Sequence, residues 1–131
     1  LAIDAFSSDA IPLHLLTTEA FGVYLRALAP GGLLVVHISN RYFELEPVLA
    51  AAARQHGLAI AVRADNPYDR TLLTPSTWVA LSRDPSRLKA LAAARPDAPW
   101  KAPLPPAPVA WTDDHASILP YIEWAKLLRQ P

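Results

Sequence analysis

The run LLVVHI at residues 33–38 restricts more than any other feature what this chain can fold into. It has the length of a strand and is almost entirely apolar, which is typical of a strand covered on both faces. Such strands belong to sheets that carry helices on both sides. Shorter apolar runs at residues 1–3, 58–62 and 77–82 predict three further strands.

Helical patterns separate the first three of these strands, and a polar loop at residues 65–75 separates the last two. Thr17 or Thr18 is expected to cap a first helix, which the Pro-Gly-Gly run at 30–32 ends. A second helix tolerates Pro47 only in its first turn, and Gly57 lies just past its end. The alternation of strands and helices predicts an α/β fold with a mainly parallel sheet.

The last third of the chain has a different composition. Asp84 is expected to cap a third helix that ends near residue 94, and six prolines lie between residues 96 and 108. This stretch is predicted to be an extended connector, and Pro120 is predicted to begin a terminal amphipathic helix. We therefore divide the chain into a domain portion, 1–95, and a connector with its terminal helix, 96–131.

Composition excludes several functions. The 12 basic and 12 acidic residues leave no net charge to attract nucleic acid or an anionic membrane. Without cysteine there is no disulfide, thiolate nucleophile or zinc–thiolate site. No apolar run approaches the ~18 residues of a membrane span, so we expect a cytoplasmic location and leave an upstream membrane tether open. The chain lacks Met and starts inside a strand pattern, so we expect a piece of a longer protein.

Polar side chains end the first two predicted strands: Asp4 the first, and His37, Ser39 and Asn40 the second. Ligands of open α/β sheets bind beyond the carboxyl ends of the strands, so parallel neighbours would bring these residues to one rim. A carboxylate there can take a proton from an amine, and Asp9 is a second carboxylate nearby. The alternative is that Asp9 caps a turn and His37 is an ordinary core histidine.

Two other kinds of site are disfavoured by the pattern. A Ser–His–Asp hydrolase using Ser7 or Ser8 would lack the G-x-S-x-G turn. A metal site at Asp113, Asp114 and His115 would lack a ligand partner at helical spacing, so no metal is expected. The WTDD segment is predicted either to form a turn that caps the following helix or to bring Asp113 or Asp114 to the active-site rim.

The segments IDAFSSDAIP, HLLTTEAF, LAPGGLLVVHISNRY, WVALSRD and WTDD follow one another along the chain. Together they resemble the spermidine synthase-like family of the class I S-adenosylmethionine-dependent methyltransferase superfamily. The resemblance implies the C-terminal half of a Rossmann-like methyltransferase fold, with a mainly parallel sheet, helices on both faces and a final antiparallel strand. The family's Gly-rich nucleoside loop precedes the matched region.

The resemblance also implies roles for individual residues. Asp4 and Asp9 match the two aspartates of the family's D-x-x-D-P-x-G-P segment, the first of which helps to deprotonate the attacking amine. They are five positions apart instead of three, and Ala10 replaces the proline. Asp4 and Ala5 are implied to contact the cofactor. The residues implied to contact the acceptor are His37, Ser39, Asn40, Asp113 and Asp114.

The implied activity of the intact protein is transfer of an aminopropyl or methyl group. The donor is S-adenosylmethionine or decarboxylated S-adenosylmethionine, and the acceptor is a small molecule that carries an amine. The isolated chain is expected to be inactive and to bind no cofactor. The alternative is a non-catalytic interaction or assembly module that keeps the fold. An unpaired edge at the first strand predicts a homodimer, formed through residues 1–6 or the helix at 18–28.

Overall fold

The computed structural model describes residues 1–5, 12–40, 42–66 and 74–128. In these residues four strands form one sheet: β1 (Ala2–Ile3), β2 (Leu34–His37), β3 (Ala59–Asp65) and β4 (Ser76–Ser82). Their order across the sheet is β1-β2-β4-β3. The strand predictions are confirmed, and β3 is longer than its apolar core suggested.

The strand directions correct one expectation. β1 runs parallel to β2, whereas β4 is antiparallel to both of its neighbours, β2 and β3. Three strands therefore point the same way, but β4 lies between two of them, and the sheet is mixed rather than mainly parallel. The reason is that β4 follows β3 directly in the chain and returns beside it, as in a hairpin. The final strand is antiparallel, as expected.

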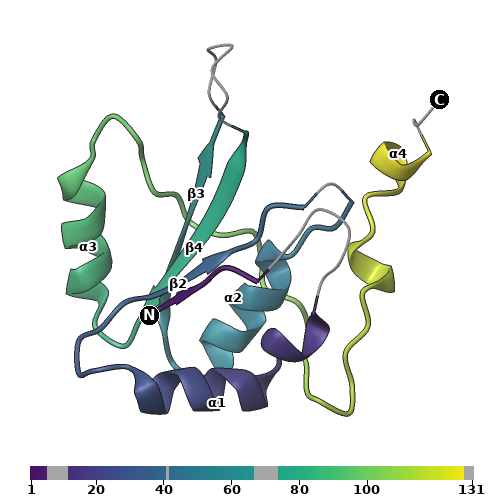
Figure 1. Cartoon of the computed structure of the whole chain (residues 1–131), viewed down its shortest axis with the longest axis horizontal. Coiled ribbons are helices and arrows are strands. Elements are labelled where there is room, and N and C mark those ends of the chain that lie inside the picture. Colours follow the sequence, from purple (N-terminus) through teal and green to yellow (C-terminus); the bar gives the residue numbers. More distant parts are fainter. Residues whose placement is uncertain (6–11, 41, 67–73, 129–131) are drawn as a thin grey trace.

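Helices cover both faces of the sheet, as the sequence predicts. α1 (Thr18–Ala27) and α2 (Glu46–Gln55) contribute buried side chains to the main core, and α3 (Pro85–Ala94) contacts β3 and β4. Figure 1 shows α3 on the other side of the strands from α2. The predicted caps are confirmed: Thr17 Oγ1 accepts from the Ala20 N–H at 3.3 Å, and Asp84 Oδ1 accepts from the Ser86 N–H at 2.9 Å.

The main core lies between the sheet and the pair α1 and α2. Val36, Val79 and Val62 occupy paired positions on adjacent strands and are almost fully buried. Phe21 of α1 and Leu49 of α2 are inaccessible to solvent in the same cluster. The sheet face that packs on α1 and α2 therefore carries large aliphatic residues, and the opposite face carries other kinds of side chain.

The other face carries two contrasting rows. One row crosses the sheet at paired positions and is made of small or medium side chains: Ala2, Val35, Ala80 and Ala61. The row beside it consists of large side chains, each with a planar group: His37, Trp78 and Arg63. His37 ends β2 directly after the Ile3↔Val36 pair, so Asp4, the residue that follows β1, lies next to it.

The segment after α3 returns to the sheet and the core. Lys101 forms an antiparallel bridge with Val62, with N···O distances of 2.7 and 2.8 Å. Trp111 is 5% exposed in the main core, and its carbonyl accepts from the Thr18 N–H at 2.8 Å. In the described residues 96–108 there is no helix, which confirms the extended connector that the prolines predict.

The single terminal helix predicted from Pro120 is wrong. The structure has a 3-10 turn, η2 (Leu119–Tyr121), and then one short helix, α4 (Trp124–Leu127). Between them Ile122 is extended, with φ −71° and ψ 124°, and bridges Phe43 in antiparallel fashion. This pairing with residues 42–44 replaces helical hydrogen bonds and breaks the amphipathic pattern into two pieces.

Candidate functional site

Three of the predicted site residues meet at the carboxyl ends of β1 and β2. His37 Nδ1 lies 2.8 Å from Asp4 Oδ1, and His37 Nε2 lies 2.6 Å from Ser39 Oγ. Ser39 Oγ also accepts from the backbone N–H of Thr77 at 2.7 Å. A continuous chain of hydrogen bonds therefore joins the start of β4 to the carboxylate of Asp4.

The donors and acceptors of this chain follow from the groups themselves. A carboxylate oxygen only accepts, so Nδ1 of His37 donates to Asp4. In the neutral imidazole Nε2 is then the acceptor and receives the hydroxyl proton of Ser39. The Thr77 N–H meanwhile donates to the Ser39 oxygen. Both ring nitrogens of His37 and the oxygen of Ser39 thus have partners, and the arrangement corresponds to the Nδ1–H tautomer of the neutral ring.

Trp78 completes the support of His37. It is paired with His37 across β2 and β4, and the two rings stack with centroids 4.6 Å apart and planes inclined by 24°. The side chain of His37 is 20% exposed, whereas that of Asp4 is 62% exposed. The imidazole is thus held from three sides, and the carboxylate that it orients is open to a ligand. Sequence reasoning missed Trp78, although its place in a strand pattern was visible.

The chain Asp4–His37–Ser39 has the connectivity of a hydrolase triad, but Ser39 is poorly placed as a nucleophile. Its oxygen is tied to the backbone of β4, and it lies two residues after His37 on the same strand end. Activated serines are presented instead on a sharp, exposed turn beside oxyanion donors. Ser39 therefore acts as an anchor for the imidazole.

The remaining residues predicted at this rim have other positions. Asn40 Oδ1 accepts from the N–H groups of Tyr42 at 3.1 Å and Phe43 at 2.6 Å, and its Nδ2 donates to the Ile38 carbonyl. Its side chain thus shapes the turn after β2. Ala5 follows Asp4 and is exposed. Asp9, like Ser7 and Ser8, lies outside the described residues.

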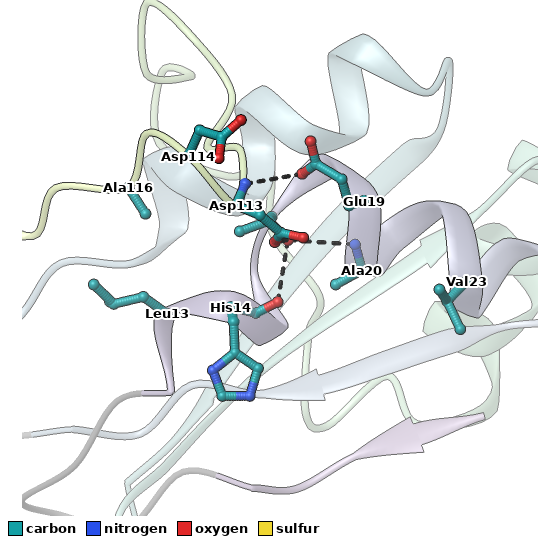
Figure 2. Close-up of a pocket in the computed structure, with 9 residues that line it drawn as sticks. Leu13, His14, Glu19, Ala20, Val23, Asp113, Asp114 and Ala116 are labelled. Atoms are coloured by element: carbon teal, nitrogen blue, oxygen red, sulfur yellow. Dashed lines mark hydrogen bonds between the residues drawn. The ribbon is translucent and has the colours of Figure 1, made fainter.

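Asp113 and Asp114 lie in a different place, a pocket of about 540 Å³ at the start of α1 (Figure 2). Asp113 Oδ1 is 2.7 Å from Thr17 Oγ1, and the Asp113 N–H donates to Glu19 Oε2 at 3.1 Å. The complete lining is Leu13, His14, Thr17, Glu19, Ala20, Val23, Asp113, Asp114 and Ala116. Neither Asp4 nor His37 is part of it.

The WTDD segment forms the predicted turn, but the turn contacts α1 instead of capping the helix that follows it. Thr112 and His115 exchange backbone hydrogen bonds of 3.1 Å, which closes the turn. Asp113 then contacts the capping residue of α1 rather than the helix that follows in sequence. Its carboxylate therefore ties the last third of the chain to the first helix. In the portion that the structure describes, no three His, Asp or Glu side chains converge as metal ligands.

Gly31 and Gly32 do not form a nucleoside loop. Gly31 has φ +68° and a Cβ there would lie 3.1 Å from the guanidinium of Arg87, while one on Gly32 would lie 2.8 Å from Leu28. They let the chain turn tightly from α1 into β2.

Comparison with known proteins assigns no family: no family model, curated protein or solved structure matches this chain. Among the described helices, none has the length and apolar character needed to cross a bilayer.

Proposed function

We propose that this chain is the acceptor-side part of a spermidine synthase-like transferase, which moves an aminopropyl or methyl group to an amine in the cytoplasm. The observation that carries the proposal is the Asp4 carboxylate, held by His37 at 2.8 Å and open to solvent at the carboxyl ends of two parallel strands. The final antiparallel strand, β4, agrees with the class I methyltransferase fold that the resemblance implies.

In this proposal Asp4 binds and deprotonates the acceptor. Its Oδ1 is occupied by the Nδ1–H of His37, so Oδ2 is the atom that accepts an N–H of the incoming amine. As the amine nitrogen forms its new bond to carbon, the N–H proton passes to Oδ2. His37 keeps the carboxylate in one orientation, which lowers the entropy cost of reaching the reactive geometry.

S-adenosylmethionine or its decarboxylated form, bound by other residues of the intact protein, supplies the electrophilic carbon and the sulfur leaving group. The acceptor side is therefore where variants of this chain should affect the reaction.

The test is Asp4→Asn in the full-length protein encoded by the gene. We expect kcat for transfer from either donor to an amine to fall by about 10²–10⁴, because the amide keeps the shape but takes no proton. The donor Kd should stay within about twofold, since Asp4 contacts the amine side. Asp97→Asn, at an exposed carboxylate paired with Arg95, is the matched control and should keep full turnover.

Two results would contradict the proposal. An unchanged kcat in folded Asp4→Asn protein would remove Asp4 from the reaction. If the wild-type protein transferred neither group to any amine and bound neither donor, the chain would be a non-catalytic assembly module, which is the alternative that the fold allows.

A further inference from the structure

The row of large side chains on the face opposite the main core continues past β3. His37 is paired with Trp78, and Trp78 with Arg63. The antiparallel bridge between Val62 and Lys101 brings the residue before Lys101, Trp100, beside Arg63. A single line of side chains therefore leads from the candidate base across the sheet: Asp4, His37, Trp78, Arg63 and Trp100.

A pocket of about 250 Å³ opens along this line. Its lining is Val35, Arg63, Asp65, Trp78 and Trp100. The hollow exists because the neighbouring row of the same face is made of alanines and Val35, which leave space beside the two indoles. Trp78 is shared between this pocket and the stack on His37, so the pocket adjoins the candidate site.

The charge of the pocket restricts its ligand. Arg63 donates from Nε and Nη2 to Asp65 Oδ1 at 2.9 and 2.7 Å, so the only two charged groups in the lining neutralise each other. A cation or an anion would have to compete with that ion pair. A neutral flat ring, by contrast, gains stacking on tryptophan without disturbing it. The exposed carboxylate at the other end of the line, Asp4, is complementary to an ammonium group.

We propose that this pocket, the tryptophan slot, binds the aromatic ring of an arylalkylamine whose nitrogen reaches Asp4. Asp4 follows β1 and Trp78 is in β4, two strands away across β2. Adjacent strands are about 4.8 Å apart, so the two residues are separated by about 10 Å across the sheet. Subtracting about 3 Å for the hydrogen bond between ammonium and carboxylate leaves about 7 Å between nitrogen and ring. An arm of about four carbons spans that distance.

This inference names the acceptor class of the proposed transferase and rests on that proposal for the role of the amine. Binding to the slot needs no donor, however, so the two ideas can fail separately. If 4-phenylbutylamine binds at the slot but is never alkylated, the transferase proposal fails and the slot stands. If aliphatic diamines are alkylated and the phenyl compound has no advantage, the slot fails and the transferase stands.

The experiment compares 4-phenylbutylamine with 4-cyclohexylbutylamine, which has the same amine and a ring without π faces. Calorimetry on the full chain should give at least a tenfold lower Kd for the phenyl compound. Trp100→Leu should weaken phenyl binding by about tenfold and leave the cyclohexyl compound within about twofold, because the ring stacking is what it removes. Trp124→Leu, at a 55% exposed tryptophan of α4, is the control and should change neither Kd.

A second readout does not depend on how the variants fold. In the wild-type chain, the indole N–H resonances of Trp78 and Trp100 should shift on titration with 4-phenylbutylamine, while that of Trp124 stays in place. Equal affinity for the two amines, or shifts confined to other tryptophans, would overturn the proposal.

Discussion

His37 is the residue on which the candidate site depends, because both of its ring nitrogens and one of its faces are engaged. Sequence reasoning placed Asp4, His37 and Ser39 on one rim, since strand ends in an α/β fold collect polar groups. It did not place Trp78 there, because the position of β4 next to β2 is a matter of sheet order. No local pattern in a sequence reports which strands become neighbours.

At the residue scale, we predict that Ser39→Ala destabilises the chain by about 1–3 kcal/mol, because the Thr77 N–H and His37 Nε2 both lose their partner in a half-buried place. Urea unfolding measures this change. Ser117→Ala, at an exposed serine, is the control and should stay within about 0.5 kcal/mol of wild type. Equal midpoints for the two variants would show that the serine is not an anchor.

At the scale of elements, local chemistry predicted most of the fold. Thr17 and Asp84 cap helices as expected, and Pro47 lies in the first turn of α2. The prediction failed where a distant contact decides the local conformation. The helical pattern after Pro120 breaks because Ile122 pairs with Phe43, and that partner is nearly eighty residues away in sequence.

Gly57 gives a test of the element ends, because it follows α2 with φ +64° and a Cβ there would meet nothing within 4 Å. We predict that Gly57→Ala lowers the free energy of unfolding by about 1–2 kcal/mol, from backbone conformation alone. Gly57→Asn should lose less, since asparagine adopts this conformation more readily. Thermal unfolding of the two variants compares them. An alanine variant as stable as wild type would contradict the assigned turn.

At the scale of the whole molecule, the last segment is fastened to the turn after β2. The Glu44 N–H donates to the Tyr121 carbonyl at 2.8 Å, and the Glu123 N–H donates to the Tyr42 carbonyl at 2.7 Å. Burial raises the pKa of Glu44, and the neighbouring charges of Glu46 and Glu123 raise it further, while Lys126 opposes them. The ionised form of Glu44 is therefore disfavoured in the folded chain.

The sign of the pH effect follows from that raised pKa. Below the ordinary pKa of 4.5 the carboxyl of Glu44 is protonated, and the folded chain keeps its full stability. As the pH rises through the raised pKa, the folded chain has to hold the disfavoured ionised form, so stability is lost. We predict that Glu44→Gln is more stable than wild type at pH 7 and that the difference disappears at pH 4. Denaturant unfolding at both pH values measures it.

Asp97 supplies a control of opposite sign. Hydrogen bonding to Arg95 lowers its pKa, so its contribution is present at neutral pH and fades as the pH falls through the lowered value. Asp97→Asn should therefore lose stability at pH 7 and approach wild type in acid. A Glu44→Gln variant that behaved in the same way as Asp97→Asn would refute the assignment at Glu44.

Self-association also belongs to this scale. In the described sheet β1 pairs only with β2, and Leu1 beside it is 50% exposed. Such an edge favours pairing with an identical edge about a twofold axis. We predict a dimer by light scattering at high concentration and a monomer for Ala2→Lys, because a charged edge resists pairing. Val109→Lys, at a 73% exposed site, should remain dimeric. A wild-type monomer at every concentration would exclude the dimer.

The place of β4 also sets the order in which the chain can become organised during synthesis. β2 and β3 are made before it, yet β2 gains its second strand neighbour, and β3 its first, only when residues 76–82 arrive. On the ribosome, β3 must wait for the hairpin partner that follows it, and β2 must wait through about forty further residues. Until then both strands present open edges to other nascent chains. Substitutions in β4 should therefore reduce the yield of folded protein more than equally buried substitutions in β1.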